Sequence, residues 1–165
     1  MGLFAGYANY ALLFAALPFC LWATFSDLKY MTIPNKLVMA MAVAFIAVGI
    51  TVLPYDIFLW RFLVGLIVLA VGFLLFAIGG MGGGDAKFGA VMVLFVAYED
   101  LVSFVLILAL VTLIAVTLHF IIGKMPFAKN LATNWKSWEK NKKFPLGFGM
   151  GAALVCYLVL EAVTV

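Results

Sequence analysis

The sequence predicts an all-α, polytopic membrane protein, a bundle of about six transmembrane helices, and its composition is the main reason. Of its 165 residues 68% are hydrophobic and only 10% are charged. A soluble domain carries about 45–50% apolar and about 25% charged residues. One small globule cannot bury so much apolar surface, so the lipid bilayer is the natural second solvent. This composition excludes a soluble enzyme and a nucleic-acid-binding module, and residues 1–165 are expected to form a single membrane-embedded domain.

Six apolar runs, separated by charged or Gly- and Pro-rich breaks, supply the expected helices. They are Leu3–Phe25, Leu37–Leu53, Ile57–Ile78, Phe88–Tyr98, Leu101–Ile122 and Leu146–Leu160. In lipid each must be helical, because irregular backbone would leave its amides unpaired. The fourth run is short: at about 1.5 Å a residue it reaches about 17 Å, against about 30 Å of hydrocarbon. We expect it either to begin earlier, with residues 83–85, or to lie where the bilayer is thinned or water-filled.

The basic residues predict the orientation of the chain. Arg61 is the only one on the side of the even-numbered connections, and we expect its side chain to snorkel to the outer interface. The others lie in the first, third and fifth connections, which the positive-inside rule assigns to the cytoplasm. Both termini are then outside. These residues are Lys29, Lys36, Lys87, Lys124, Lys129, Lys136, Lys140, Lys142 and Lys143.

For several other residues a structural role is favoured over a functional one. Trp135 and Trp138 lie in the long connection Lys124–Phe144, where an interfacial helix that contacts anionic lipids is favoured over a substrate-docking element. His119 is expected to be a hydrogen-bonded interior residue. Neither cysteine belongs to a CxxC pair, so a zinc site is unsupported, and no metal or cofactor is expected.

Two aspartates on the predicted cytoplasmic side are the best candidates for chemistry. Asp27 ends the first apolar run and Asp85 precedes the fourth. Two carboxylates that lie close together cannot both ionise easily, so one of them keeps a proton near neutral pH. Such a pair can deprotonate water and protonate a leaving amine. Taken singly, Asp27 could instead be a loop residue paired with Lys29, and Asp85 could merely cap a helix.

A run of glycines precedes Asp85. Five of the six residues from Gly79 to Gly84 are glycine, with Met81 between them. Backbone without side chains can approach another chain closely, and within a membrane such a stretch must be covered by protein or line a wet cavity. An extended peptide substrate could lie against it, although a flexible turn would have the same composition.

Together these stretches resemble the type IV prepilin peptidases, membrane aspartyl proteases of the GxGD class. One element is Asp27 followed by a basic, polar run into Ile33-Pro34-Asn35, and the other is Gly82-Gly83-Gly84-Asp85-Ala86-Lys87. A weaker similarity is Phe144-Pro145-Leu146-Gly147 before the last run. The joint presence of both aspartate motifs is more specific than GxGD alone.

The resemblance implies an intramembrane endopeptidase that needs no cofactor. It would remove the short basic leader from prepilin or pseudopilin substrates at the cytoplasmic face of the bacterial inner membrane, in contact with membrane lipids. Asp27 and Asp85 would be the catalytic pair, with Gly82, Gly83, Gly84 and Lys87 in a substrate-binding loop. The chain is similar to the short Tad/Cpa-type form that serves Flp pili. It has no paired CxxC motifs, so N-methyltransferase activity is not expected.

The main alternative is a small transporter or channel subunit that uses Asp27 and Asp85 as ion-binding carboxylates. Transporters usually place such groups near the middle of the membrane, on broken helices of related halves. Here both aspartates fall at helix ends on one side. A structural subunit of a pilus or secretion assembly is the third possibility, but it would not need a glycine run beside an acid.

Overall fold

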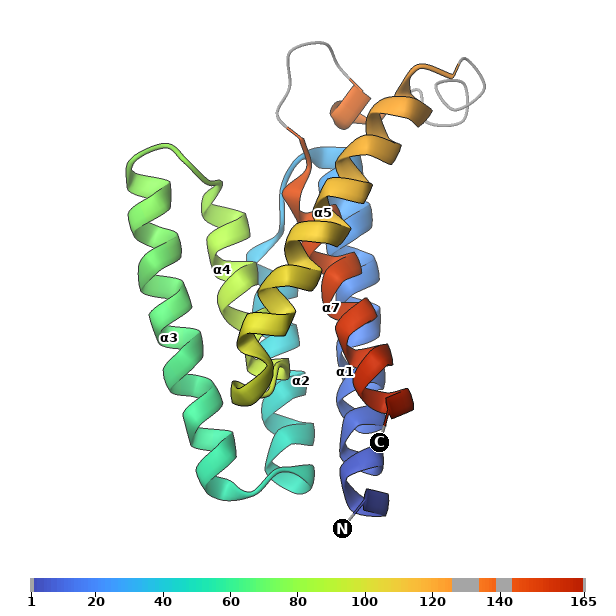
Figure 1. Cartoon of the computed structure of the whole chain (residues 1–165). Coiled ribbons are helices and arrows are strands. Elements are labelled where there is room, and N and C mark those ends of the chain that lie inside the picture. The colour runs from blue at the N-terminus through green and yellow to red at the C-terminus, as the bar shows by residue number, and fades with distance from the viewer. Residues whose placement is uncertain (1, 126–133, 139–143, 165) are drawn as a thin grey trace.

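The chain forms a bundle of helices that run up and down along one direction (Figure 1). This computed structural model describes residues 2–125, 134–138 and 144–164. In these ranges the α-helices are α1 (Gly2–Tyr30), α2 (Asn35–Val52), α3 (Tyr55–Ala77), α4 (Gly83–Met92), α5 (Leu101–Gly123) and α7 (Leu146–Thr164). Short 3₁₀ turns are η1 (Val93–Phe95), η2 (Tyr98–Asp100) and η3 (Lys136–Trp138).

The predicted all-α bundle is confirmed, and each of the six apolar runs contributes a helix. Five helices in the described part of the chain are long and apolar enough to cross a membrane: α1, α2, α3, α5 and α7. The exception is α4, whose 10 residues reach about 15 Å at 1.5 Å per residue. It begins at Gly83, which is the earlier start that the shortness of its apolar run led us to expect.

The end of α4 explains the position of Arg61. After Met92 the chain continues into η1, whose three residues are buried. Arg61 on α3 is only 7% exposed, and its Nη1 donates a hydrogen bond to the Leu94 carbonyl over 3.1 Å. The expectation that Arg61 snorkels to the outer interface is therefore wrong, because a short internal helix needs a buried donor at its end.

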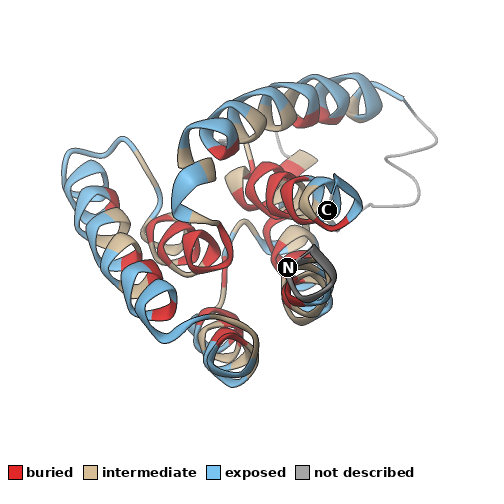
Figure 2. Cartoon of the chain, turned by 60° about the horizontal axis from the view of Figure 1, so that its bottom comes forward, coloured by how far each residue is buried: buried red, intermediate tan, exposed pale blue. Residues whose placement is uncertain are grey.

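Packing is closest around α4 and α7. Figure 2 shows buried residues concentrated in these two helices, with exposed residues along the outer faces of α3 and α5. On α3, a Cβ at Gly72 would lie 2.9 Å from the Cβ of Ala86 on α4, so only glycine allows the two helices to approach this closely. Ala86 follows Asp85, and this contact therefore helps to fix where the aspartate lies.

Both termini lie at one end of the bundle, and the α1–α2 and α3–α4 connections lie at the other (Figure 1). The outward faces remain apolar: Leu66 on α3 is 63% exposed and Leu110 on α5 is 62% exposed. Such surfaces suit contact with lipid acyl chains. The positive-inside rule predicts that the end with the two connections faces the cytoplasm.

Candidate active site

Asp27 lies near the end of α1 with only 5% of its surface exposed. The chain reverses directly after the helix, where Met31 has a left-handed φ of 56° and donates its N–H to the Asp27 main-chain carbonyl over 2.8 Å. The Ser26 hydroxyl donates to the Thr32 carbonyl, also over 2.8 Å. A left-handed residue that is not glycine costs about 1–2 kcal/mol, and these local bonds offset it. They hold residues 31–33 beside the Asp27 carboxyl.

Asp85 lies in the first turn of α4, after the glycine run. Gly79, with a φ of 75°, turns the chain beyond the end of α3, as glycine commonly does. Gly82 is the N-cap of α4, and a Cβ on it would lie 2.6 Å from Oδ2 of Asp85. The carboxyl therefore folds back against the beginning of its own helix, where the helix dipole favours negative charge, and only glycine leaves room for it.

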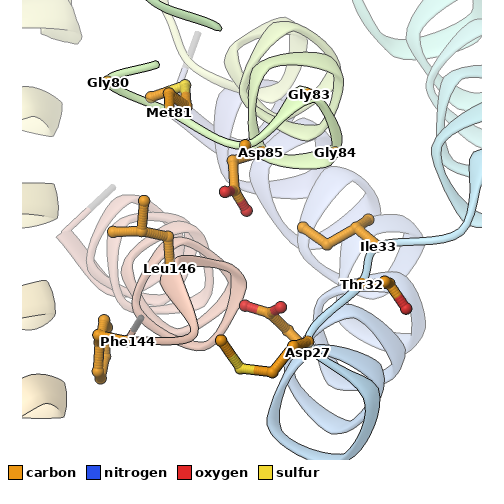
Figure 3. Close-up of a pocket in the computed structure, with 12 residues that line it drawn as sticks. Asp27, Thr32, Ile33, Gly80, Met81, Gly83, Gly84, Asp85, Phe144 and Leu146 are labelled. Atoms are coloured by element: carbon orange, nitrogen blue, oxygen red, sulfur yellow. The ribbon is translucent and has the colours of Figure 1, made fainter. Parts of the chain in front are cut away.

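The two aspartates line one cavity of about 380 Å³. Figure 3 shows their carboxyl groups directed into it, Asp27 from α1 and Asp85 from α4. Bare main chain forms one wall and larger apolar side chains form much of the rest. The lining residues are Asp27, Met31, Thr32, Ile33, Gly80, Met81, Gly82, Gly83, Gly84, Asp85, Phe144 and Leu146.

The electrostatics of this cavity favour a shared proton. Asp85 lies outside the five long spans, and burial raises the pKa of its carboxyl above the ordinary value, while a hydrogen bond with the main chain of Gly82 lowers it in part. The neighbouring carboxyl of Asp27 adds a like charge, which disfavours ionisation of both groups together. The pair can therefore hold one proton as a unit and combine an acid with a base in one space.

The predicted loop residues divide into two groups. Gly82, Gly83 and Gly84 line the cavity, whereas Lys87 is not among the lining residues. The Lys87 ammonium donates a hydrogen bond to Oδ1 of Asn35, the first residue of α2, over 3.1 Å. Two positions along a helix correspond to about 200° of rotation, which directs Lys87 away from the side of α4 that carries Asp85.

Residues whose role the sequence alone does not reveal complete the site. Ile33 and Leu146 supply apolar walls, and the Gly147 amide donates a buried hydrogen bond to Oδ2 of Asp27 over 2.7 Å. The stretches around Pro34 and Pro145 drew attention through their similarity to a family, but nothing in their composition indicated that they meet. What they share is their position, since each directly precedes a helix at the same end of the bundle.

His119 lies outside the cavity lining. Its ring is 8% exposed, its Nε2–H donates to the Ser137 carbonyl over 3.2 Å, and it stacks on Trp138 at 4.9 Å between ring centroids. The expected hydrogen-bonded interior histidine is thus confirmed. Only η3 and a few flanking residues of the Lys124–Phe144 connection are described, so the predicted interfacial helix lies largely outside the described residues.

Comparison with known families gives one match. The profile of the type IV leader peptidase family matches residues 14–123, a region that contains both aspartates and the whole glycine run. No curated protein and no solved structure matched the chain significantly. The family match covers more than half of the chain and agrees with the resemblance seen in the two aspartate motifs. The chain therefore belongs to the type IV leader peptidase family, a family of membrane-embedded aspartic endopeptidases.

Proposed function

We propose that this protein removes the short basic leader from prepilin-like substrates, with Asp27 and Asp85 as the catalytic pair. Family membership supports the class of reaction and of substrate. The assignment of the two residues depends on one observation: carboxyl groups from α1 and α4, far apart in sequence, line a single cavity (Figure 3). Aspartyl proteolysis needs two such groups within reach of one water molecule.

The proposed reaction uses the one proton that the pair holds. The ionised carboxyl takes a proton from a water molecule as its oxygen attacks the scissile carbonyl carbon. The protonated carboxyl gives its proton to the carbonyl oxygen, which forms a neutral tetrahedral diol. When the C–N bond breaks, one hydroxyl proton returns to the pair and the leaving nitrogen receives a proton from the other carboxyl. The pair ends with one proton, as it began.

The walls of the cavity suit a peptide in an extended conformation. The main chain of residues 80–84 lies on one side without bulky side chains apart from Met81. Its amides and carbonyls can approach the backbone of a substrate. Ile33 and Leu146 offer apolar contacts for side chains near the cut, while the negative charge of the pair favours a basic leader.

The position of the cavity supports cleavage at the cytoplasmic face of the bacterial inner membrane. The described lysines of the first and third connections, Lys29, Lys36 and Lys87, belong to the same end of the bundle as the two aspartates. By the positive-inside rule this end is cytoplasmic, and the same rule keeps the basic leader of a substrate on that side. Among prepilin-like substrates, Flp-type pilins are the ones that we propose first.

An ion-conducting role is the competing function, since buried carboxylates also bind cations. Both aspartates lie at the ends of helices, at one end of the bundle, beside a run of glycines. A transport site is more often found on broken helices near the midplane. The bare main chain of residues 80–84 can bind a peptide backbone, whereas a simple ion path does not need it.

The experiment is cleavage of a small pilin in liposomes of purified protein. The substrate carries a basic leader, a glycine and one apolar helix, and the mass of the released leader reports the cut. We expect Asp27→Asn and Asp85→Asn each to abolish cleavage while both proteins still insert. Asp56→Asn is the matched control, because Asp56 is exposed at the start of α3, at the other end of the bundle. Retained cleavage in either active-site variant would remove that residue from the mechanism. If the wild-type protein conducts protons or cations and both variants lose this flux, the transporter is favoured.

A further inference from the structure

The first turn of α7 holds the carboxyl group of Asp27. Gly147, near the start of that helix, donates its amide proton to Oδ2 of Asp27 over 2.7 Å, and the bond is buried. A hydrogen bond to a charged group is shorter and stronger than one between neutral groups. Gly147 also lies outside residues 14–123, the region that the family profile matches.

Position 147 has no space for a side chain. A Cβ there would lie 2.9 Å from Oδ2 and 3.1 Å from Cβ of Asp27, and 2.8 Å from Cδ1 of Ile33. Contacts below 3.0 Å do not occur for real Cβ atoms, so at least one of these groups would have to move. Asp27 has little freedom to do so, since it is only 5% exposed and lies within a continuous helix.

We propose that Gly147 is a positioning residue for the reaction, a role that rests on the proposed function of Asp27. Its amide fixes Oδ2 of Asp27, so that the second oxygen of the carboxyl is presented to water in the cavity. Its missing side chain permits the close approach that this bond requires. Gly82 has the equivalent spatial relation to Asp85, where a Cβ would lie 2.6 Å from Oδ2. Each carboxyl is therefore placed against a glycine at the beginning of a helix.

The first test compares Gly147→Ala with Gly149→Ala in the liposome assay. A Cβ at Gly149 would lie 2.8 Å from Thr112 Oγ1 on α5, so this control crowds the same helix two residues later without contacting Asp27. Because a misplacement of about 1 Å can cost about 100-fold in rate, we expect kcat to fall by about that factor in Gly147→Ala with KM little changed. We expect Gly149→Ala to lose thermal stability more than kcat. Equal kcat values for the two variants would overturn the proposal.

A double variant separates crowding of Ile33 from displacement of Asp27. Ile33→Val removes Cδ1, the atom of Ile33 that the new methyl group would contact. The quantity compared is the fold loss of kcat caused by Gly147→Ala, measured once in wild type and once in Ile33→Val. If the fold loss is the same in both, Asp27 is the group affected. Recovery in the double variant would overturn the proposal, because the loss would then come from Ile33 alone.

A spectroscopic test needs no substitution at position 147. Leu146-Gly147 is the only Leu-Gly pair in the sequence, so protein labelled with ¹³C-carbonyl leucine and ¹⁵N-glycine gives one selectively detectable amide signal in detergent. We expect that proton far downfield, and we expect Asp27→Asn to move it upfield more than Asp85→Asn does. An ordinary shift that Asp27→Asn leaves unchanged would overturn the proposal. Failure of the proposed function would look different: wild type would not cleave, or Asp27→Asn would remain active, whatever the amide signal shows.

Discussion

Alanine substitutions in the glycine run test the geometry of the site, because the three glycines before Asp85 differ in what a new methyl group would meet. At Gly82 the added Cβ would lie 2.6 Å from Oδ2 of Asp85. At Gly83 the nearest atom is on the ring of Phe76, at 3.4 Å, and at Gly84 it is Cβ of Ile33, also at 3.4 Å. The last two distances are ordinary van der Waals contacts. Only Gly82→Ala should therefore displace one of the two proposed catalytic groups.

The size of the effect follows from this contact. To restore a permitted distance, the Asp85 carboxyl must move by about half an ångström or rotate away from the start of α4. Since a misplacement of about 1 Å costs about 100-fold, we expect Gly82→Ala to lower kcat by about 10- to 100-fold. Backbone strain does not contribute, because φ of Gly82 is −74°, which any residue adopts. Replacing the N-cap glycine with alanine costs about 1 kcal/mol of stability or less, too little to unfold the protein.

The assay is the initial rate of leader release at several pilin concentrations, with thermal unfolding measured on the same preparations. Gly83→Ala and Gly84→Ala are the matched controls and should retain kcat, and any effect of their methyl groups on peptide binding should appear in KM. Alanine gains up to about 1 kcal/mol over glycine in a helix, so they should unfold at the same or a higher temperature than wild type. If Gly82→Ala folds and cleaves like wild type, Oδ2 of Asp85 does not occupy its working position in this structure. If all three variants are equally slow, the whole run needs bare backbone and the contact at Gly82 has no special role.

Three further predictions concern the same cavity. Gly84→Val should be severely impaired in cleavage, although Gly84→Ala should be tolerated. The methyl groups of the valine would extend toward the main chain of Ile33, which lies 3.5 Å from the Cβ position. Full activity of Gly84→Val in the same assay would show that this glycine is only a linker. Because burial raises the pKa of Asp85, the pair should keep its one proton to higher pH than free aspartates do. The value of kcat should therefore fall on the alkaline side only when the pair loses that proton. A rate that rises steadily into the alkaline range would contradict the shared proton. Chelators should leave cleavage unchanged, because the proposed reaction uses two carboxyls, and a loss that added zinc reverses would show that a metal takes part.

The sequence predicts most of this fold because lipid leaves few choices. Each apolar run had to become a helix, and all six did. The length of the short fourth run alone distinguishes it from the others, and its start at Gly83 is one of the two arrangements that this length predicts. Arg61 was misassigned because snorkelling depends only on distance to the interface, whereas its actual hydrogen bond depends on where α4 stops inside the bundle. Hydropathy carries no information about that internal helix end.

The site was predictable only in part. The two aspartates could be found because ionisable residues are rare in an apolar chain, and the glycines because five of them directly precede Asp85. Lys87 was assigned to the substrate loop from a motif, whereas the helix that begins at Gly83 turns it toward Asn35. Gly147 could not be assigned from the sequence because its role depends on a contact across 120 positions, and a single glycine at the start of a helix gives no sign of which side chain it meets.

The placement of each aspartate reflects the cost of burying a carboxylate at the edge of a membrane. Transfer of an ionised group from water to an apolar interior costs far more free energy than one hydrogen bond contributes. The carboxyl of Asp85 lies beside Gly82, at the beginning of its own helix, where the helix dipole offsets part of this cost. Asp27 lies near the C-terminal end of α1, where the helix dipole opposes negative charge, so it needs a donor from elsewhere, and the Gly147 amide supplies one. The start of α7 also contributes Leu146 to the cavity wall. A helix outside the matched family region is therefore as much a part of the proposed catalytic unit as the two helices that carry the acids.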